Sequence, residues 1–241
     1  MSGRDLQYKE NLSGDFFIEH RVTQTTEKAG FHIHDVFEFL LILSDGMRCV
    51  VGEKTYALNR NTLLLFSNMD LHFVSMLPSA MVNDRYLLYF RPEYIQTLSS
   101  ASTNLLECFF YRPFDDPNIL ALQEDETREL LNLLVQIDGQ YHCPGSGDAF
   151  GRDLLLKFLL GQFLVKVNLI YRRSHNLSTS VDTDAYSRIY NIMNLIHQNY
   201  AEDLSLDCLA SRFFINKCYM CSLFKKVTGM SPNSYSFPAS S

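Results

Sequence analysis

Three histidines and one glutamate form the first set of residues that could do chemistry. His32, His34 and Glu38 lie close together in the sequence, and His72 follows further along the chain. On one extended strand the first three share a parity, so their side chains would point to the same face. Three imidazole nitrogens and one carboxylate suit a divalent transition metal. The same groups could instead hydrogen-bond to one another inside a barrel or line a pocket for an organic effector.

A second candidate site is a basic segment near the C-terminus. Residues 208–235 contain four cationic side chains and no acidic one, although the whole chain has a formal net charge of -6. A local positive charge in an acidic protein favours a polyanion such as DNA. An ordinary solvated helix face would have the same composition.

The same segment has the pattern of a helix-turn-helix. Ser205 is a candidate N-cap for a short helix, residues 212–215 carry the turn, and Asn216 is a candidate N-cap for residues 217–227. In such a motif the second helix offers its outer face to the DNA major groove, although an ordinary three-helix bundle would show a similar pattern. The residues expected to contact DNA are Arg212, Lys217, Cys218, Tyr219, Cys221, Ser222, Lys225 and Lys226.

Other motifs give no indication of catalysis. Cys218 and Cys221 form a CxxC pair, which can ligate zinc or do redox chemistry, but no second pair accompanies it. Cys143 follows His142 in a Pro/Gly-rich segment without a third partner. Nucleophile-elbow, P-loop and dinucleotide-binding motifs are absent from the sequence, so we expect no enzymatic activity.

The elements that must position these residues change along the chain. Between residues 16 and 90 short apolar runs alternate with turn signals, which is typical of an all-β sandwich or barrel. Residues 124–140 and 148–173 have helical periodicity instead. A polar segment at 174–183 then precedes a further helix expected at 185–200.

Composition places the chain among ordinary globular proteins. Hydrophobic residues make up 46% and charged residues 20%, which excludes collagen, a coiled-coil rod and wholesale disorder. The apolar stretch 154–171 contains two lysines and is expected to be a buried helix, not a membrane span. The first residues contain no apolar run typical of a signal peptide, so the six scattered cysteines are expected to be reduced thiols in the cytoplasm.

The C-terminal segment resembles the first helix-turn-helix of the AraC/XylS family of bacterial transcription regulators. The matching positions are Leu206, Leu209, Ala210, Asn216, the run LFKKVTGMSP at 223–232, and Tyr235. The N-terminal part is similar to the cupin-type sensor domain common in that family. There His32, His34 and Glu38 fit the first cupin motif and His72 fits the second.

The resemblance implies an α+β chain with several parts. A cupin-like jelly-roll barrel would occupy residues 1–92, a helical segment that dimerises 93–173, a linker 174–184, and an incomplete all-α helix-turn-helix subdomain 185–241. The family carries two helix-turn-helix units, whereas residues 236–241 (SFPASS) oppose helix continuation. We therefore expect a truncated DNA reader that binds specific DNA weakly or only as a dimer.

The function implied is that of a cytoplasmic, ligand-responsive transcription activator. It would bind promoter DNA as a homodimer, hold a small molecule such as a sugar in the barrel, and need no cofactor or membrane. The expected effector contacts are His32, His34, Glu38, His72 and Tyr86. Leu40 shares their inferred parity but is expected to pack in the core. The alternative is a metal-binding cupin enzyme or metal sensor that uses His32, His34, Glu38 and His72 for a divalent ion.

Overall fold

A computed structural model gives the structure of the chain. It describes residues 14–24, 30–34, 36–68, 70–100, 103–110, 118–143, 150–177, 188–189, 191–193, 195–196, 205–228 and 231–232. The chain divides into two compact units. One comprises Met1–Phe109 and Pro117–Asn176, and the other comprises Phe110–Asp116 and Leu177–Ser241.

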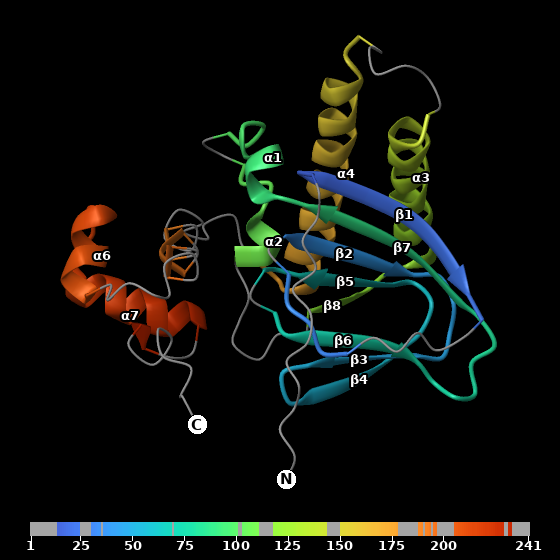
Figure 1. Cartoon of the computed structure of the whole chain (residues 1–241), viewed down its shortest axis with the longest axis horizontal. Coiled ribbons are helices and arrows are strands. Elements are labelled where there is room, and N and C mark those ends of the chain that lie inside the picture. The colour runs from blue at the N-terminus through green and yellow to red at the C-terminus, as the bar shows by residue number, and fades with distance from the viewer. Residues whose placement is uncertain are drawn as a thin grey trace. The chain divides into compact units, whose positions relative to one another are not determined.

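The described part of the first unit contains two antiparallel sheets (Figure 1). The larger sheet has the strand order β1-β7-β2-β5-β8 and the smaller one β4-β3-β6. The strands are β1 (Phe16–Thr23), β2 (Phe37–Ile42), β3 (Met47–Val51), β4 (Lys54–Leu58), β5 (Thr62–Phe66), β6 (His72–Met76), β7 (Asn83–Phe90) and β8 (Ile119–Ala121). The expected strand-rich barrel region is therefore confirmed.

Both faces of the larger sheet are covered, which explains the unbroken apolar runs in β2 and β5. Every residue of these two strands is buried. Leu40 and Ile42 pack in a core cluster that includes Met47 and Cys49 of the smaller sheet. Phe39, which precedes Leu40, points to the other face, because successive side chains on a strand alternate.

Four helices in the described part of this unit accompany the sheets. They are α1 (Pro92–Gln96), α2 (Glu107–Phe110), α3 (Glu124–Tyr141) and α4 (Arg152–Ser174). The ring of Phe39 meets Phe163 of α4 edge-on, with centroids 5.2 Å apart. Figure 1 shows α3 and α4 beside the larger sheet. The two long expected helices are confirmed, although α4 begins at Arg152 because Gly151 has a left-handed φ of 77°.

Helix α4 is long and apolar enough to span a membrane by length and composition, but half of that apolar window is buried inside the structure. Asn168 of α4 donates to the carbonyl of Leu105 and accepts from the backbone N–H of Cys108. Arg172 donates to both carboxylate oxygens of Glu107, at 2.6 and 2.9 Å. These contacts make α4 the core helix of the first unit.

The second unit is described mainly by α6 (Leu206–Arg212) and α7 (Lys217–Thr228). Of the helix expected at 185–200, residues 188–189, 191–193 and 195–196 are described and helical. Its expected apolar face is buried where it is described, at Ile189, Ile192, Met193 and Ile196. Residues 178–184 of the expected linker lie outside the described part of the chain.

The α+β architecture expected from the sequence is confirmed, with one difference in the extent of the barrel. Strand β8 pairs with β5 through residues 119–121, so the larger sheet takes a strand from beyond residue 92. Three residues are too few to show a period of two, which is why this strand has no signal in the sequence.

Candidate functional site

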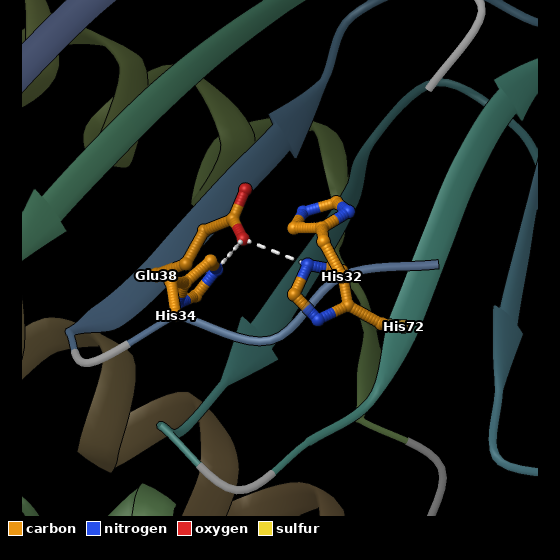
Figure 2. A group of neighbouring side chains, drawn as sticks. All are labelled: His32, His34, Glu38 and His72. Atoms are coloured by element: carbon orange, nitrogen blue, oxygen red, sulfur yellow. Dashed lines mark hydrogen bonds and ion pairs between the residues drawn. The ribbon is translucent and has the colours of Figure 1, made fainter. Parts of the chain in front are cut away.

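The three histidines and the glutamate converge inside the barrel (Figure 2). Nε2 of His34 lies 2.8 Å from Oε2 of Glu38, and Nε2 of His72 lies 3.1 Å from the same oxygen. His32 stands beside His72 with ring centroids 4.3 Å apart. One potential ligand atom from each of the four side chains lies within 4.8 Å of the others. His34, Glu38 and His72 are buried, and His32 is partly buried.

The shared parity predicted that His32, His34 and Glu38 lie on one strand, but the structure brings them together in another way. Only Glu38 belongs to β2, where it faces the same side as Leu40. His32 forms an isolated bridge with His72, the first residue of β6, through two backbone hydrogen bonds of 3.1 and 3.2 Å. The cluster therefore joins the two sheets, because β2 belongs to the larger sheet and β6 to the smaller.

Backbone carbonyls orient all three imidazole rings in the same way. Nδ1 of His32 lies 3.1 Å from the carbonyl oxygen of Gly30. Nδ1 of His34 lies 3.0 Å from the carbonyl oxygen of Val36, and Nδ1 of His72 lies 2.8 Å from that of Asp70. A carbonyl can only accept, so each Nδ1 carries the proton in these bonds, and each Nε2 keeps a lone pair when the ring is neutral. Nε2 of His72 is buried without a well-directed hydrogen bond, and its 3.1 Å approach to Glu38 is an ion-pair contact.

The electrostatics favour a charged glutamate among the histidines. Burial alone would raise the pKa of Glu38, but the hydrogen bond of His34 and the close, charged contact of His72 outweigh it and hold the pKa well below its ordinary value. Burial, followed by the neighbouring His72, lowers the pKa of His32. Burial, followed by the charge of Glu38, raises the pKa of Cys49 to about 12, so this thiol stays protonated at neutral pH.

Two aromatic residues that the sequence analysis did not single out border the cluster. The ring of Phe66 stacks on His72 with centroids 3.8 Å apart, and Tyr89 meets His34 edge-on at 5.4 Å. Phe66 pairs directly with Glu38 in the register of β2 and β5, and Tyr89 pairs with Glu38 in that of β2 and β7. The strand pairing, which the sequence does not reveal, was the signal needed to find them.

Tyr86 does not belong to this site. On β7, Leu87 and Tyr89 pack in the core between the sheets, so Tyr86 points to the opposite face. Its ring stacks on His20, with centroids 4.4 Å apart. The structure therefore does not group Tyr86 with the histidines, because the parity of β7 was not known from the sequence, and its contact with an effector stays a prediction. Leu40, by contrast, packs in the core as expected.

We expect acid to destabilise the metal-free barrel in two steps. The pKa of His32 is lowered from 6.5, so the unfolded chain binds more protons and stability falls as the pH drops below that value. The lowered pKa of Glu38 adds stability above 4.5 that is lost at lower pH. Urea unfolding of chelator-treated protein across this pH range measures both steps. The His32→Asn variant should lack the upper step, and an unchanged pH profile would contradict the assignment.

The second candidate site has the local geometry of a helix-turn-helix. The hydroxyl of Ser205 accepts from the backbone N–H of Cys208 at 3.2 Å. Oδ1 of Asn216 accepts from the N–H groups of Cys218 and Tyr219, at 2.9 and 3.2 Å. Both expected N-caps are thus confirmed. Phe214, with a left-handed φ of 51°, lies in the turn that separates α6 from α7.

The two faces of α7 differ as the pattern predicted. Met220, Leu223 and Phe224 are buried together with Leu209 and Ala210 of α6. Most residues expected to contact DNA are exposed: Arg212, Lys217, Cys218, Tyr219, Ser222 and Lys225. Cys221 is half-buried, and the side chain of Lys226 lies outside what is described. Whether these residues contact DNA stays a prediction.

One of the expected DNA contacts already has a protein partner. Nζ of Lys217 lies 2.8 Å from a carboxylate oxygen of Asp207 on α6. That hydrogen bond is the main reason why the pKa of Lys217 is raised. DNA would have to compete with Asp207 for this ammonium group.

Solved structures of regulators and of cupin barrels resemble this chain. ToxT from Vibrio cholerae is 13% identical, with 93% of this chain and 98% of that chain covered and a TM-score of 0.43. The AraC-like transcriptional activator CuxR is 12% identical, with 79% and 61% covered and a TM-score of 0.36. A cupin 2 conserved barrel domain protein from Salinispora arenicola is 13% identical, with 35% and 71% covered and a TM-score of 0.28.

No family model and no curated protein sequence matches the chain. ToxT has been solved with an unsaturated fatty acid bound, which is a property of that protein. The truncation expected after the first helix-turn-helix has no support in these comparisons and stays a prediction.

Proposed function

We propose that the chain is a ligand-responsive transcription regulator of the AraC type. It would bind promoter DNA through α7 and a small molecule in the barrel, and it would act as a cytoplasmic homodimer. The observation that carries the proposal is the two-sided character of α7. Its apolar side chains are buried beside α6, while a polar and cationic face remains exposed.

The exposed face of α7 has the chemistry that reading DNA requires. Lys225 can meet a phosphate, and Ser222 and Tyr219 can hydrogen-bond to base edges. The α7 N-cap at Asn216 fixes the start of the helix, so these side chains are held on a rigid element.

The barrel contains a cluster of polar side chains to which a small molecule could hydrogen-bond. His32, His34, His72 and Glu38 offer hydrogen-bond donors and acceptors, with Phe66 and Tyr89 beside them. Hydroxyl groups of a sugar or a related metabolite suit such a set, because each hydroxyl both donates and accepts. An effector that binds the folded barrel raises its melting temperature, so a metabolite library can be screened by thermal unfolding.

Binding of duplex DNA selected from a random library tests the DNA-reading part. We expect the Lys225→Ala variant to bind the selected duplex more weakly and to reduce the slope of log K against log salt by about one, as loss of one phosphate contact requires. The matched control is Arg60→Ala, which removes an exposed cation from the barrel unit. Equal behaviour of the two variants, or a selection that enriches no sequence, would contradict the proposal.

A divalent metal site in the barrel is a second candidate, favoured by the orientation of the imidazoles. Metal-binding histidines typically donate the other ring nitrogen to a carbonyl or carboxylate, and all three histidines here do so. The buried Nε2 of His72 has no well-directed hydrogen bond within the described chain. The donor set of three nitrogens and one carboxylate fits a first-row transition metal. Such an ion would act either as the signal that is sensed or as an anchor for the effector.

Metal analysis of protein purified without added metal tests this second candidate. We expect about one iron, manganese, nickel or zinc ion per chain, and loss of this ion in the His34→Ala variant. His142→Ala is the matched control, since His142 is exposed and pairs with Asp138 away from the cluster. A barrel that contains no metal and does not bind added metal would favour a purely organic effector.

A further inference from the structure

The N-terminal part of α7 carries two thiols whose redox chemistry the proposed function does not use. Cys218 is exposed and Cys221 is half-buried, and both are free. They are three residues apart on a helix, where side chains lie on the same face. Lys217 precedes them, and both cysteines contribute, after Asp207, to the raised pKa of its ammonium group. The two sulfurs therefore lie within electrostatic range of one cation.

We propose that Cys218 and Cys221 are a redox-sensitive thiol pair that a low-molecular-weight disulfide oxidises to an intramolecular disulfide. Cys218, the more exposed thiol, attacks the small disulfide, forms a mixed disulfide and releases one thiol. Cys221 then attacks the sulfur of Cys218 and releases the second thiol. Two protein thiols and one small disulfide thus become one protein disulfide and two small thiols.

The disulfide is sterically possible but not within an undistorted helix. Side chains three residues apart on a helix have Cβ atoms about 5–6 Å apart. A disulfide requires about 3.5–4.5 Å, so closing the bond must deform the first turn of α7. The same turn contains the N–H groups of Cys218 and Tyr219, which Asn216 caps. Oxidation should therefore weaken the cap and move the side chain of Tyr219.

The consequence for DNA rests on the proposed function. Cys218, Tyr219 and Cys221 lie on the face expected to meet base edges. A displaced first turn loses contacts to base edges, which are the contacts that discriminate between DNA sequences. We therefore expect the oxidised protein to bind the selected duplex at least about tenfold more weakly, and reductant to restore the affinity.

Mass spectrometry tests the bond independently of DNA. Cleavage after Lys217 and Lys225 releases one peptide that contains both cysteines. After the full chain is treated with oxidised glutathione, we expect this peptide to be lighter by two hydrogens. In the Cys221→Ser variant it should instead carry glutathione on Cys218. In the same samples, amide exchange of residues 218–220 should rise on oxidation while that of α6 stays constant.

The DNA measurement then compares affinities with and without oxidant. The Cys218→Ser/Cys221→Ser variant should show no change on oxidation, whereas Cys208→Ser, which removes an exposed thiol of α6, should respond like the original chain. If the reduced protein binds DNA but the peptide keeps its mass, the thiol pair is disproved. If the disulfide forms and the α7 amides open while neither state binds DNA, the thiol pair stands and the DNA-reading function is overturned.

Discussion

We expect the Phe158→Glu variant to be a monomer where the original chain forms the proposed homodimer. The exposed face of α4 carries Leu155, Phe158, Gln162, Val165 and Leu169, spaced alternately three and four residues apart. This is the spacing of the seam in a two-helix coiled coil, with Gln162 as the polar position that can set the register. The opposite face of α4 is buried within its own unit, so a second copy of α4 is the occupant we expect for this seam.

The substitution removes a phenyl ring that is 57% exposed and would place a charge within the seam. Loss of the aromatic contact together with burial of that charge should raise the dimer dissociation constant at least about 100-fold. Sedimentation or light scattering measures the mass. The matched control is Val135→Glu on α3, where the valine is 52% exposed but lies outside the seam. A monomeric original chain at high concentration would remove the dimer prediction altogether.

Glu38→Ala should cost the metal-free barrel about 3–5 kcal/mol of its free energy of unfolding. The carboxylate is buried, and its Oε2 lies within ion-pair distance of Nε2 of His34 and of Nε2 of His72. Its removal leaves polar imidazole nitrogens buried without a partner, and it opens a small cavity between the two sheets. Urea unfolding of chelator-treated protein at neutral pH gives the difference.

Two further variants separate the role of the carboxylate from general effects of substitution. Glu53→Ala removes an exposed glutamate from the β3–β4 turn and should change the free energy of unfolding by no more than about 0.5 kcal/mol. Glu38→Gln keeps an acceptor oxygen at nearly constant volume and should cost less than Glu38→Ala. Equal stability of Glu38→Ala and Glu53→Ala would mean that the carboxylate does not hold the cluster together.

The parts of the fold with strong local signals were predictable from the sequence. Helix α3 begins at the expected residue and differs from the prediction by one residue at its end. The caps Ser205 and Asn216 were also found, because each side chain satisfies backbone N–H groups of its own helix. Such interactions are local, so sequence spacing alone defines them.

The features that were missed depend on strand pairing and turn geometry. The register of β7 with β2 decides which β7 side chains face the core between the sheets. The sequence does not reveal this register, so it grouped Tyr86, and not Tyr89, with the histidines. The four side chains converge, but not because His32 and Glu38 share a strand. His32 is held near Glu38 by its backbone bridge to His72, the first residue of β6. The Nδ1 contacts to backbone carbonyls depend on turn geometry near each histidine, which residue types do not determine.

Strand β2 places Glu38 in the barrel interior and the adjacent Phe39 against α4. Their Cα atoms are joined by a single peptide unit of about 3.8 Å, so neither residue can shift without carrying the other. An engineer who reshapes β2 to accept a new effector will therefore also disturb the packing beneath the α4 seam. Pocket redesign in this protein should begin on β6, which belongs to the smaller sheet.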